Sequence, residues 1–320
     1  LDSLRGLRVL ILGEAIIDQY DFGERMDGSP KGGVLPMRHL STELFAGGSL
    51  ACANHVANFC SNVRLVANLG FTSSYEGFIR EHLSANVQPS FLVRDGMPTI
   101  VKRREVDRTY LTKVTETYFM DDTPLSLGEE SALLQLLSEN IDETDLVLVV
   151  DYGHGLITPR IVNFLEQEAP FLAVNAQTNS ANKGYHVIHR YPHADFVCVD
   201  HQEARLTLRD KHGDINEIAA RIQNDLKAGT VAVTLGHKGS LMRNTDTAVV
   251  TPVFSKKVVD TIGAGDAFLS LTAPCVFNGV PLEVTALLGN ATGALATTYL
   301  GNKKSVNATM LCNFVTSLLG

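Results

Sequence analysis

The sequence predicts an α/β protein with a doubly wound, mostly parallel sheet and a small β lid. Short, continuous apolar runs alternate along the chain with helical patterns. Such runs are typical of strands buried on both faces, as in a parallel sheet covered by helices. Two longer stretches, 21–45 and 99–120, break this alternation and are polar, β-rich or marked by Gly and Pro. Pairing of these two stretches would give a small accessory sheet. Loops this long are usually functional, lids included, so we interpret this sheet as a lid.

The core strands are expected where the continuous apolar runs lie, at 9–12, 64–69, 146–150, 171–174, 196–199 and 231–235. Apolar residues at helical spacing predict helices at 48–59, 74–84, 159–168, 215–226, 265–277, 282–299 and 306–319. The runs end at the glycine or polar residues Gly13, Gly70, Asp151, Asn175, Asp200 and Gly236. Ligands bind at this edge of a doubly wound sheet, so a site is expected there before any motif is considered.

The length suits one large domain. At about 150 residues per domain, 320 residues could form two, but a single α/β domain can run longer. The alternation continues through the whole chain. We therefore expect one domain over residues 1–320, with lid strands inserted at about 20–46 and 97–120.

Composition excludes some partners. The chain has 27 Lys and Arg against 35 Asp and Glu, a net charge of −8, which argues against nucleic acid and against an anionic membrane surface. The long uncharged stretch 284–302 carries Asn and Thr and reads as a buried helix, so no membrane span is expected. Five scattered cysteines without a Cys-x-x-Cys pair favour a reduced, cytoplasmic setting. Cys52 and Cys60 are expected to be buried apolar residues, not nucleophiles.

The sharpest local motif is Gly263-Ala264-Gly265-Asp266, which precedes a helical run. Glycines let backbone N–H groups approach a ligand, and a helix N-terminus attracts anions such as phosphate. Asp266 has two interpretations: it caps the helix, or it is a general base beside an anion hole. No Walker A sequence occurs, and no Gly-x-Gly-x-x-Gly follows the first strand, which disfavours a P-loop enzyme and a Rossmann dehydrogenase.

Residues 260–266 resemble the C-terminal signature of the ribokinase-like (PfkB) carbohydrate kinases. Counterparts follow in family order: the first strand with Asp18, the glycines at 46–49, and the nucleotide-binding turn at 233–239. Segments such as 151–158, Asp-Tyr-Gly-His-Gly-Leu-Ile-Thr, resemble the heptose-phosphate kinase branch, the kinase half of ADP-heptose synthesis proteins. The resemblance covers about residues 8–301.

The resemblance implies a ribokinase-like fold and an ATP-dependent, Mg²⁺-requiring kinase that phosphorylates a hydroxyl of a sugar or sugar phosphate. Asp266 would be the base, and Gly263, Ala264 and Gly265 would form the anion hole. The substrate-binding residues would be Asp18, Gly48, Asn54 and Asp151. The ATP site would contain Thr234, Gly236, Gly239 and Asn290. The metal residues would be Asp200 and Glu203.

The resemblance also implies a homodimer formed through the lid, and it leaves open a requirement for a monovalent cation. The chain starts without Met, which leaves room for a fused partner such as a nucleotidyltransferase domain.

Three departures from the family pattern leave the substrate open. Asp200 stands where the family has Asn in Asn-x-x-Glu, His154 where the heptose branch favours Lys, and 175–177 read Asn-Ala-Gln where relatives often have Asp-Pro. A ribokinase- or fructokinase-like kinase of a free sugar is therefore the main alternative to a heptose-phosphate kinase. A catalytically weakened sensor of sugars or nucleotides is a second alternative.

Some charged residues have two interpretations. Lys102, Arg103 and Arg104 could contact a substrate phosphate, but neighbours in a strand point to opposite faces, so at least one should be solvated. Lys256 and Lys257 could neutralise ATP phosphates or be exposed. His186, His189 and His193 lack a partner at metal-ligand spacing and read as a polar connector, not a zinc site.

Overall fold

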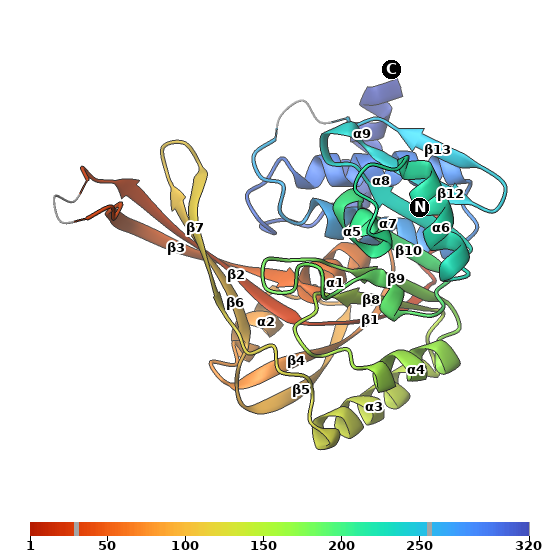
Figure 1. Ribbon diagram of the computed structural model, residues 1–320, viewed down its shortest axis with the longest axis horizontal. Coiled ribbons are helices and arrows are strands. Elements are labelled where there is room, and N and C mark those ends of the chain that lie inside the picture. The colour runs from red at the N-terminus through yellow and green to blue at the C-terminus, as the bar shows by residue number, and fades with distance from the viewer. Residues whose placement is uncertain (29–31, 255–257, 320) are drawn as a thin grey trace.

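The computed structural model describes residues 1–28, 32–254 and 258–319 (Figure 1). Lys256 and Lys257 lie outside the described residues, so neither interpretation of them is tested. In the described part of the chain, no helix is both long and apolar enough to cross a membrane.

A nine-stranded sheet forms the body, in the order β13-β12-β11-β10-β9-β8-β1-β4-β5. Its strands are β1 (Arg8–Gly13), β4 (Asn62–Thr72), β5 (Val87–Pro98), β8 (Leu146–Asp151), β9 (Leu172–Ala176), β10 (Phe196–Asp200), β11 (Thr230–Thr234), β12 (Ser240–Asn244) and β13 (Ala248–Thr251). The seven strands from β11 to β5 pair in parallel, while β12 and β13 pair antiparallel. The predicted doubly wound, mostly parallel sheet is confirmed.

Helices cover both faces of this sheet (Figure 1). They are α1 (Ser49–Ala57), α2 (Glu76–His82), α3 (Leu127–Ile141), α4 (Pro159–Glu168), α5 (His201–Leu208), α6 (Ile215–Asp225), α7 (Ala264–Phe277), α8 (Leu282–Ala296) and α9 (Ala308–Leu319). Sequence reasoning did not name α3, although its start carries a capping box between Ser126 and Glu129. It also missed the edge strand β5, whose partly exposed residues form no continuous apolar run.

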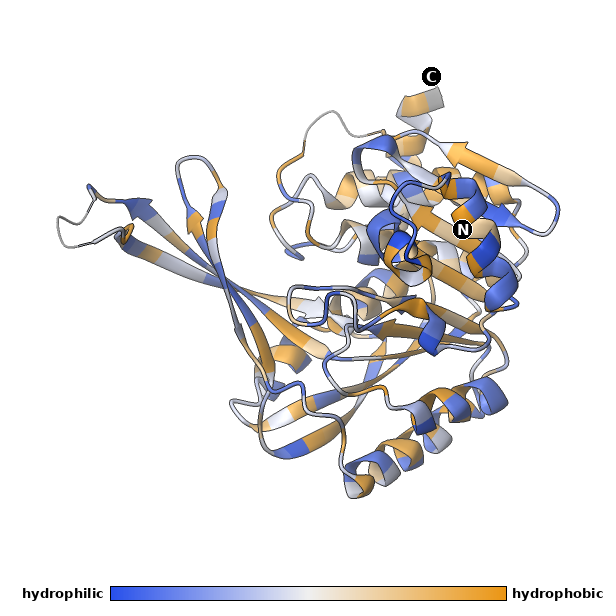
Figure 2. Cartoon of the chain, viewed as in Figure 1, coloured by the Kyte–Doolittle hydropathy of each residue, from blue (hydrophilic) through white to orange (hydrophobic). Residues whose placement is uncertain are grey.

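Strand alternation produces two cores. Val9 and Ile11 of β1 belong to the cluster on one face of the sheet, and Leu10 and Leu12 to the cluster on the other. The core strands are accordingly hydrophobic along their length in Figure 2. Cys52 and Cys60 are buried in the first cluster, as predicted.

The lid is a separate four-stranded sheet in the order β3-β2-β6-β7, which extends away from the body (Figure 1). Its strands are β2 (Ala15–Arg25), β3 (Met37–Gly48), β6 (Ile100–Asp107) and β7 (Thr112–Phe119). The two hairpins join through a parallel β2–β6 pairing that places Asp18 opposite Lys102. A small apolar cluster at the base of the lid packs against Ile262 and Leu300, so the lid contacts the Gly-rich loop.

Candidate active site

The loop 260–266 turns into α7 with some of its backbone donors free, while the Ala264 N–H donates to the Thr261 carbonyl at 3.3 Å. Gly263 is the N-cap at φ +80°, a conformation that favours glycine, and a Cβ there would collide with Asn302. In the described part of the chain, the N–H groups of Gly265 and Asp266 have no hydrogen-bond acceptor. Unpaired N–H groups at the start of a 14-residue helix suit an anion.

The same loop is tied to the lid through Asp260. This buried carboxylate accepts hydrogen bonds from Lys113 Nζ of β7 at 2.5 Å, from the Tyr20 hydroxyl of β2 at 2.8 Å and from the Gly301 N–H at 3.0 Å. The Lys113 ammonium and the N–H groups hold the pKa of Asp260 below its usual value despite its burial. Asp260 is therefore a charged anchor between the lid and the anion-binding loop.

Asp266 lies in the first turn of α7, but its side chain does not cap the helix. Its Oδ1 accepts a hydrogen bond from the Tyr152 hydroxyl at 3.0 Å. Burial raises the pKa of Asp266 to about 6, with Tyr152 and Lys102 opposing and Asp18 adding to the shift. The interpretation of Asp266 as a helix cap is therefore wrong, and its role as a base stays a prediction.

Two cavities meet at the start of α7. One has a volume of about 650 Å³ and the other about 320 Å³. Both are lined by Gln177, Thr178, Asn179, Thr261 and Gly265. Asp266 lines the smaller cavity beside this shared wall. The two cavities therefore adjoin at the start of α7, next to Asp266.

The larger cavity brings together the four residues predicted for the ATP site: Thr234, Gly236, Gly239 and Asn290. Gly239 has φ +96°, and a Cβ there would collide with the Thr251 carbonyl oxygen, so the turn after β11 requires glycine. The Asn290 amide donates to Ser240 Oγ at 2.6 Å and to the Ala286 carbonyl at 2.9 Å.

Asp200 and Glu203, the predicted metal residues, also line the larger cavity, and they form a capping box on α5. Glu203 accepts the N–H groups of Asp200 at 2.7 Å and Thr178 at 2.9 Å, one on each oxygen. Burial raises the pKa of Glu203 to about 7, although both N–H groups favour the charged form. Among the described residues, no cluster of three or more His, Cys, Asp or Glu side chains could hold a metal. Asp200 and Glu203 are therefore the two carboxylates of this wall that a Mg²⁺ bound to nucleotide phosphates could contact.

The smaller cavity is rich in charge. Asp18 and Gly48, two of the residues predicted to bind substrate, line it. Asp18 pairs with Arg104 at 2.5 Å and accepts a hydrogen bond from Asn302 at 3.2 Å. Gly48 has φ +59°, and a Cβ there would lie 2.7 Å from the Glu14 carbonyl oxygen.

Lys102 is the cation of this cavity that lacks an ionic partner. It is 7% exposed, and within the described ranges it makes no ion pair. Its Nζ lies 5.2 Å from the ring centre of Tyr118 and 5.5 Å from that of Tyr152. Burial lowers the pKa of Lys102, because the charged form loses hydration.

Asn54 is not at either cavity, which corrects the prediction that it holds a sugar hydroxyl. Its amide donates to the His82 carbonyl at 2.9 Å and accepts from the Ser84 N–H at 2.8 Å, so it fixes the connection after α2. Helix α1 starts at Ser49. Asn54 comes five residues later, so its side chain points about 140° around the helix axis from that of Ser49.

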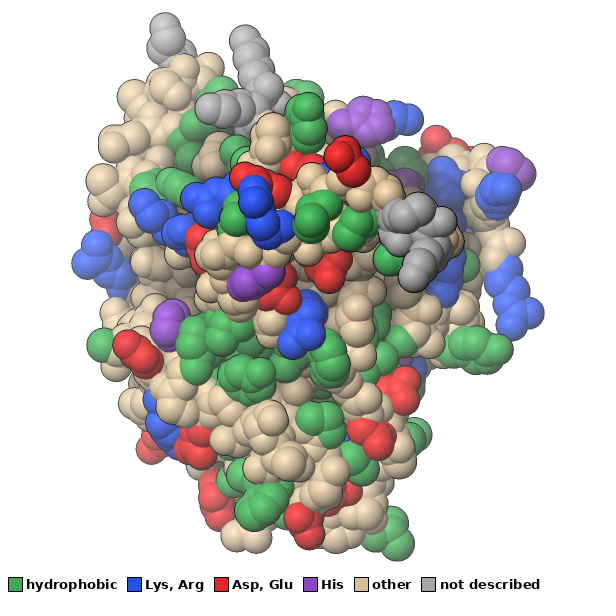
Figure 3. Space-filling model, turned by 90° about the vertical axis from the view of Figure 1, so that its left-hand side faces the viewer, with side chains coloured by type: hydrophobic (Ala, Val, Ile, Leu, Met, Phe, Trp, Pro, Cys, Tyr) green, Lys and Arg blue, Asp and Glu red, His purple; other side chains and the backbone are tan. Residues whose placement is uncertain are grey.

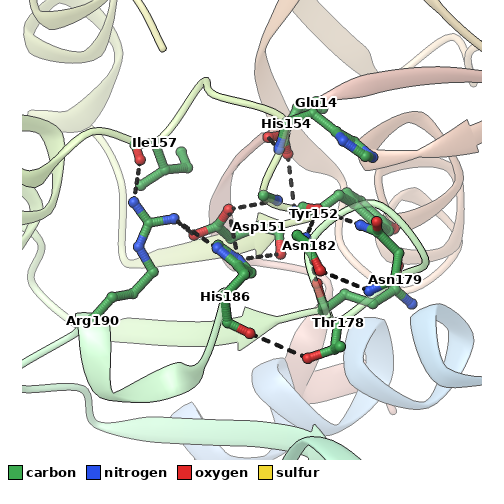
Figure 4. A network of polar contacts seen from close by, with 12 residues as sticks. Glu14, Asp151, Tyr152, His154, Ile157, Thr178, Asn179, Asn182, His186 and Arg190 are labelled. Atoms are coloured by element: carbon green, nitrogen blue, oxygen red, sulfur yellow. Dashed lines mark hydrogen bonds and ion pairs between the residues drawn. The ribbon is translucent and has the colours of Figure 1, made fainter. Parts of the chain in front are cut away.

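Asp151 is also absent from the residues that line the two cavities. It is fully buried and bonds to Arg190 at 2.7 Å and His186 at 3.2 Å (Figure 4). It also accepts a hydrogen bond from the Tyr191 hydroxyl at 2.7 Å. The prediction that it binds a sugar hydroxyl is therefore wrong, because its oxygens are already used inside the protein.

The remaining histidines of the polar connector have separate partners. His189 contacts Asp225 at 3.1 Å, and His193 lies 3.8 Å from Asp195. His154 is buried with both ring nitrogens unpaired among the described residues, and burial lowers its pKa to about 4.

Sequence reasoning did not assign Tyr118, Tyr152 or Asn302 to the site, although all three line the smaller cavity. Strand alternation separates the three basic residues of β6, as expected from the sequence. Lys102 and Arg104 line the cavity, while Arg103 between them is half exposed and pairs with Asp21 at 3.4 Å.

Comparison with known proteins gives consistent results. The family model described as pfkB family carbohydrate kinase matches residues 7–309. "Bifunctional protein HldE" of Haemophilus ducreyi is 27% identical over 317 residues, covering 96% of the chain and 63% of that protein. The protein of the same name from Koribacter versatilis is 23% identical over 297 residues, covering 92% of the chain and 60% of that protein. The chain thus spans about three fifths of the length of these curated relatives.

Solved structures share the fold. Phosphofructokinase-2 from Escherichia coli in complex with potassium has a TM-score of 0.79 at 16% identity, covering 98% of this chain and all of that one. A ribokinase from Thermotoga maritima has a TM-score of 0.71 at 19% identity, covering 97% of this chain and 99% of that one.

Proposed function

The chain belongs to the pfkB family of carbohydrate kinases, and on that premise we propose that it transfers the γ-phosphoryl group of ATP to a hydroxyl of a phosphorylated sugar. One observation carries this proposal: a larger and a smaller cavity meet at the N-terminus of α7, beside Asp266. Two substrates bound in adjoining cavities can be held in line for direct transfer, which is most of what phosphoryl transfer needs from a protein.

The larger cavity is assigned to ATP. Its volume of about 650 Å³ falls within the range of small-molecule sites, about 300–1,000 Å³. The free N–H groups of Gly265 and Asp266 are suited to the charge that develops on the phosphate oxygens. Asp200 and Glu203 would lie near the phosphates, where a bound Mg²⁺ supplies charge neutralisation.

Asp266 is assigned as the base. The acceptor oxygen bonds to the γ-phosphorus, the bond from that phosphorus to the bridging oxygen of ADP breaks, and the hydroxyl proton passes to Asp266. A carboxylate with a pKa of about 6 is ionised at neutral pH and ready to accept that proton.

The smaller cavity supports an acceptor that already carries a phosphate. Arg104 is neutralised by Asp18, whereas Lys102 is buried without an ionic partner in the described residues. A buried, unpaired cation is unfavourable, and an anionic group of the substrate would compensate it. The HldE relatives support a heptose phosphate as the finer substrate, while the ribokinase and phosphofructokinase-2 structures keep a ribokinase- or fructokinase-like free-sugar kinase as the alternative.

A coupled assay of ADP release tests the proposal. The panel contains heptose, hexose and pentose phosphates with the matching free sugars, each in Mg²⁺ and in either KCl or NaCl. We expect turnover with at least one sugar phosphate that exceeds turnover with its free sugar. Faster turnover with free sugars would favour the alternative, and binding of sugar and ATP without ADP release would favour a sensor.

We also propose a homodimer through the lid. The outer strands β3 and β7 are open sheet edges, and they expose Leu40 and Phe119. The lid side of the molecule carries apolar and charged side chains close together (Figure 3). Light scattering coupled to gel filtration should give twice the chain mass, and Leu40→Asp should shift it towards the monomer. A monomeric wild-type chain would contradict the dimer. The fused nucleotidyltransferase domain stays a prediction.

A further inference from the structure

Tyr152 donates a hydrogen bond to Asp266, the proposed base. It follows β8 directly, its side chain is buried, and its hydroxyl lies 3.0 Å from Asp266 Oδ1. The ring also lines the smaller cavity. The pKa of the Tyr152 phenol is raised well above its usual value by burial and by Asp266, so the hydroxyl keeps its proton and donates.

The backbone of Tyr152 is fixed on both sides (Figure 4). Its N–H donates to Glu14 Oε2 at 3.0 Å, and its carbonyl accepts the side-chain amides of Asn179 at 2.7 Å and Asn182 at 2.9 Å. The other oxygen of Glu14 accepts the N–H of His154 at 3.0 Å. Paired backbone donors and acceptors such as these hold this part of the loop in one conformation.

The residues on either side of Tyr152 are equally constrained. Asp151 is held by Arg190, Tyr191 and His186. Gly153 has φ +70°, and a Cβ there would collide with the amide of Asn182. Asn179 lines both cavities, whereas Asp151 and Arg190 line neither, and together these contacts fix the backbone that presents the Tyr152 hydroxyl.

We propose that Tyr152 is a positioning residue for Asp266: its hydroxyl holds Oδ1 and leaves Oδ2 to accept the proton of the substrate hydroxyl. This inference rests on the proposed role of Asp266 as base. It goes beyond that role, because it assigns the orientation of the base to the hydroxyl of the residue that follows β8.

The charges around Asp266 determine how this can be measured. Asp18 of β2 raises the pKa of Asp266, whereas Lys102 of β6 and the Tyr152 hydroxyl lower it. Cys52 of α1 and Cys198 of β10 also face it, and burial raises the pKa of both thiols, so they stay neutral. Loss of the Tyr152 hydroxyl should therefore favour protonation of Asp266.

The test compares Tyr152→Phe with Tyr191→Phe as the matched control. Tyr191 is a fully buried tyrosine of the same network whose hydroxyl donates to Asp151 at 2.7 Å. Two readouts are followed from pH 4.5 to 8.5 in the full chain. One is kcat/KM for ADP release, and the other is the ¹³C resonance of the Asp266 carboxyl, assigned with Asp266→Asn.

In Tyr152→Phe we expect both midpoints to move to higher pH by about 0.5 to 1 pH unit, the worth of one neutral hydrogen bond. Tyr191→Phe should leave both midpoints in place. Unchanged or lowered midpoints in Tyr152→Phe, or an equal shift in Tyr191→Phe, would overturn the proposal.

Two further features keep the test decisive. In the wild-type chain, the ¹³Cζ resonance of Tyr152 should titrate with the same midpoint as Asp266, so a poorly folded variant does not remove the test. Separate midpoints would count against the hydrogen bond. If the wild-type chain releases no ADP, the proposed function fails, while the carboxyl titration still decides whether Tyr152 controls Asp266.

Discussion

The two cavities are built in different ways. The larger one lies at the ends of β10 and β11 and the start of α7, and turns, caps and glycines supply much of its wall. The smaller one, half the size, is walled by Asp18, Lys102, Arg104 and Asp266, which come from the lid and from α7. One site depends on backbone conformation within the body, and the other on charged side chains that come from the lid sheet and from α7.

This difference indicates which cavity selects the acceptor substrate. A site made from backbone N–H groups and helix ends binds phosphate and discriminates little among its carriers. A site made from buried charges rejects ligands that leave those charges unpaired. We therefore expect the family chemistry to reside in the shared wall and the choice of acceptor in the smaller cavity.

The largest effect is expected at the junction. Asp266→Asn should lower turnover by about 10³-fold, because a general base contributes about 10²–10⁴. ATP binding, measured by calorimetry, should change less than about threefold. The exposed Asp122→Asn provides a control with the same chemical change and near-normal turnover.

The same variant has a stability signature. The pKa of Asp266 is raised, so the stability that this group contributes is present at low pH and lost as pH rises through about 6. Asp266→Asn should therefore melt above the wild-type chain at pH 8, and this gain should disappear by pH 4. A variant with wild-type turnover, or one that melts lower at pH 8, would break the assignment.

The second largest effect is expected at Lys102, and it distinguishes binding in the smaller cavity from binding in the larger one. Lys102→Met keeps the aliphatic length but removes the charge, so kcat/KM for a sugar phosphate should fall about 100-fold, the worth of a strong charge-assisted hydrogen bond. Free sugars and ATP should be affected little. Arg103→Met is the matched control, because Arg103 lies on the other face of β6. An equal loss for free and phosphorylated sugars would remove the argument for an anionic acceptor.

A smaller effect concerns the wall of the larger cavity. Burial raises the pKa of Glu203 to about 7, so its contribution to stability is present below its usual pKa and lost as pH rises through 7. From pH 5 to 8, the stability of Glu203→Gln relative to the wild-type chain should rise by about 2–3 kcal/mol. The exposed Glu168→Gln is the control for thermal melts across this range. If the stability difference between Glu203→Gln and the wild-type chain does not change with pH, the pKa of Glu203 is not raised by burial.

The smallest effect is expected at Asn54. Asn54→Ala removes the side-chain hydrogen bonds to Ser84 and His82, and this should lower the free energy of unfolding by about 1 kcal/mol. The KM for the sugar should stay within about twofold, because the side chain lies away from both cavities. Urea unfolding and steady-state kinetics check the two parts. A tenfold rise in KM would restore Asn54 to the substrate site.

The larger cavity could be predicted from the sequence because its information is local. The Gly263–Asp266 loop and the turn at Gly236–Gly239 form their shape within a few residues, and Asp200 and Glu203 cap one helix. Such motifs keep their geometry wherever the strand order places them. The alternation of apolar runs likewise predicted β1, β4, β8, β9, β10 and β11, but not β5, β12 and β13.

The smaller cavity could be predicted only in part, because its information is tertiary. Lys102 reaches it through the β2–β6 pairing, which links residues 84 positions apart by placing Lys102 opposite Asp18. Asp151 was misplaced because its partners Arg190 and Tyr191 lie 39 and 40 positions later and occupy its oxygens. Asn54 was misplaced because the helix start at Ser49 determines which way it points.

The most direct measurement of the central claim follows the γ-phosphate itself. The wild-type chain is mixed with ATP, Mg²⁺ and a sugar phosphate, and ³¹P NMR records where the phosphorus goes. We predict ADP and a new phosphate ester on the sugar in equal amounts, absent with Asp266→Asn over the same time. Inorganic phosphate as the main product, or equal ester formation with Asp266→Asn, would contradict transfer at the junction of the two cavities.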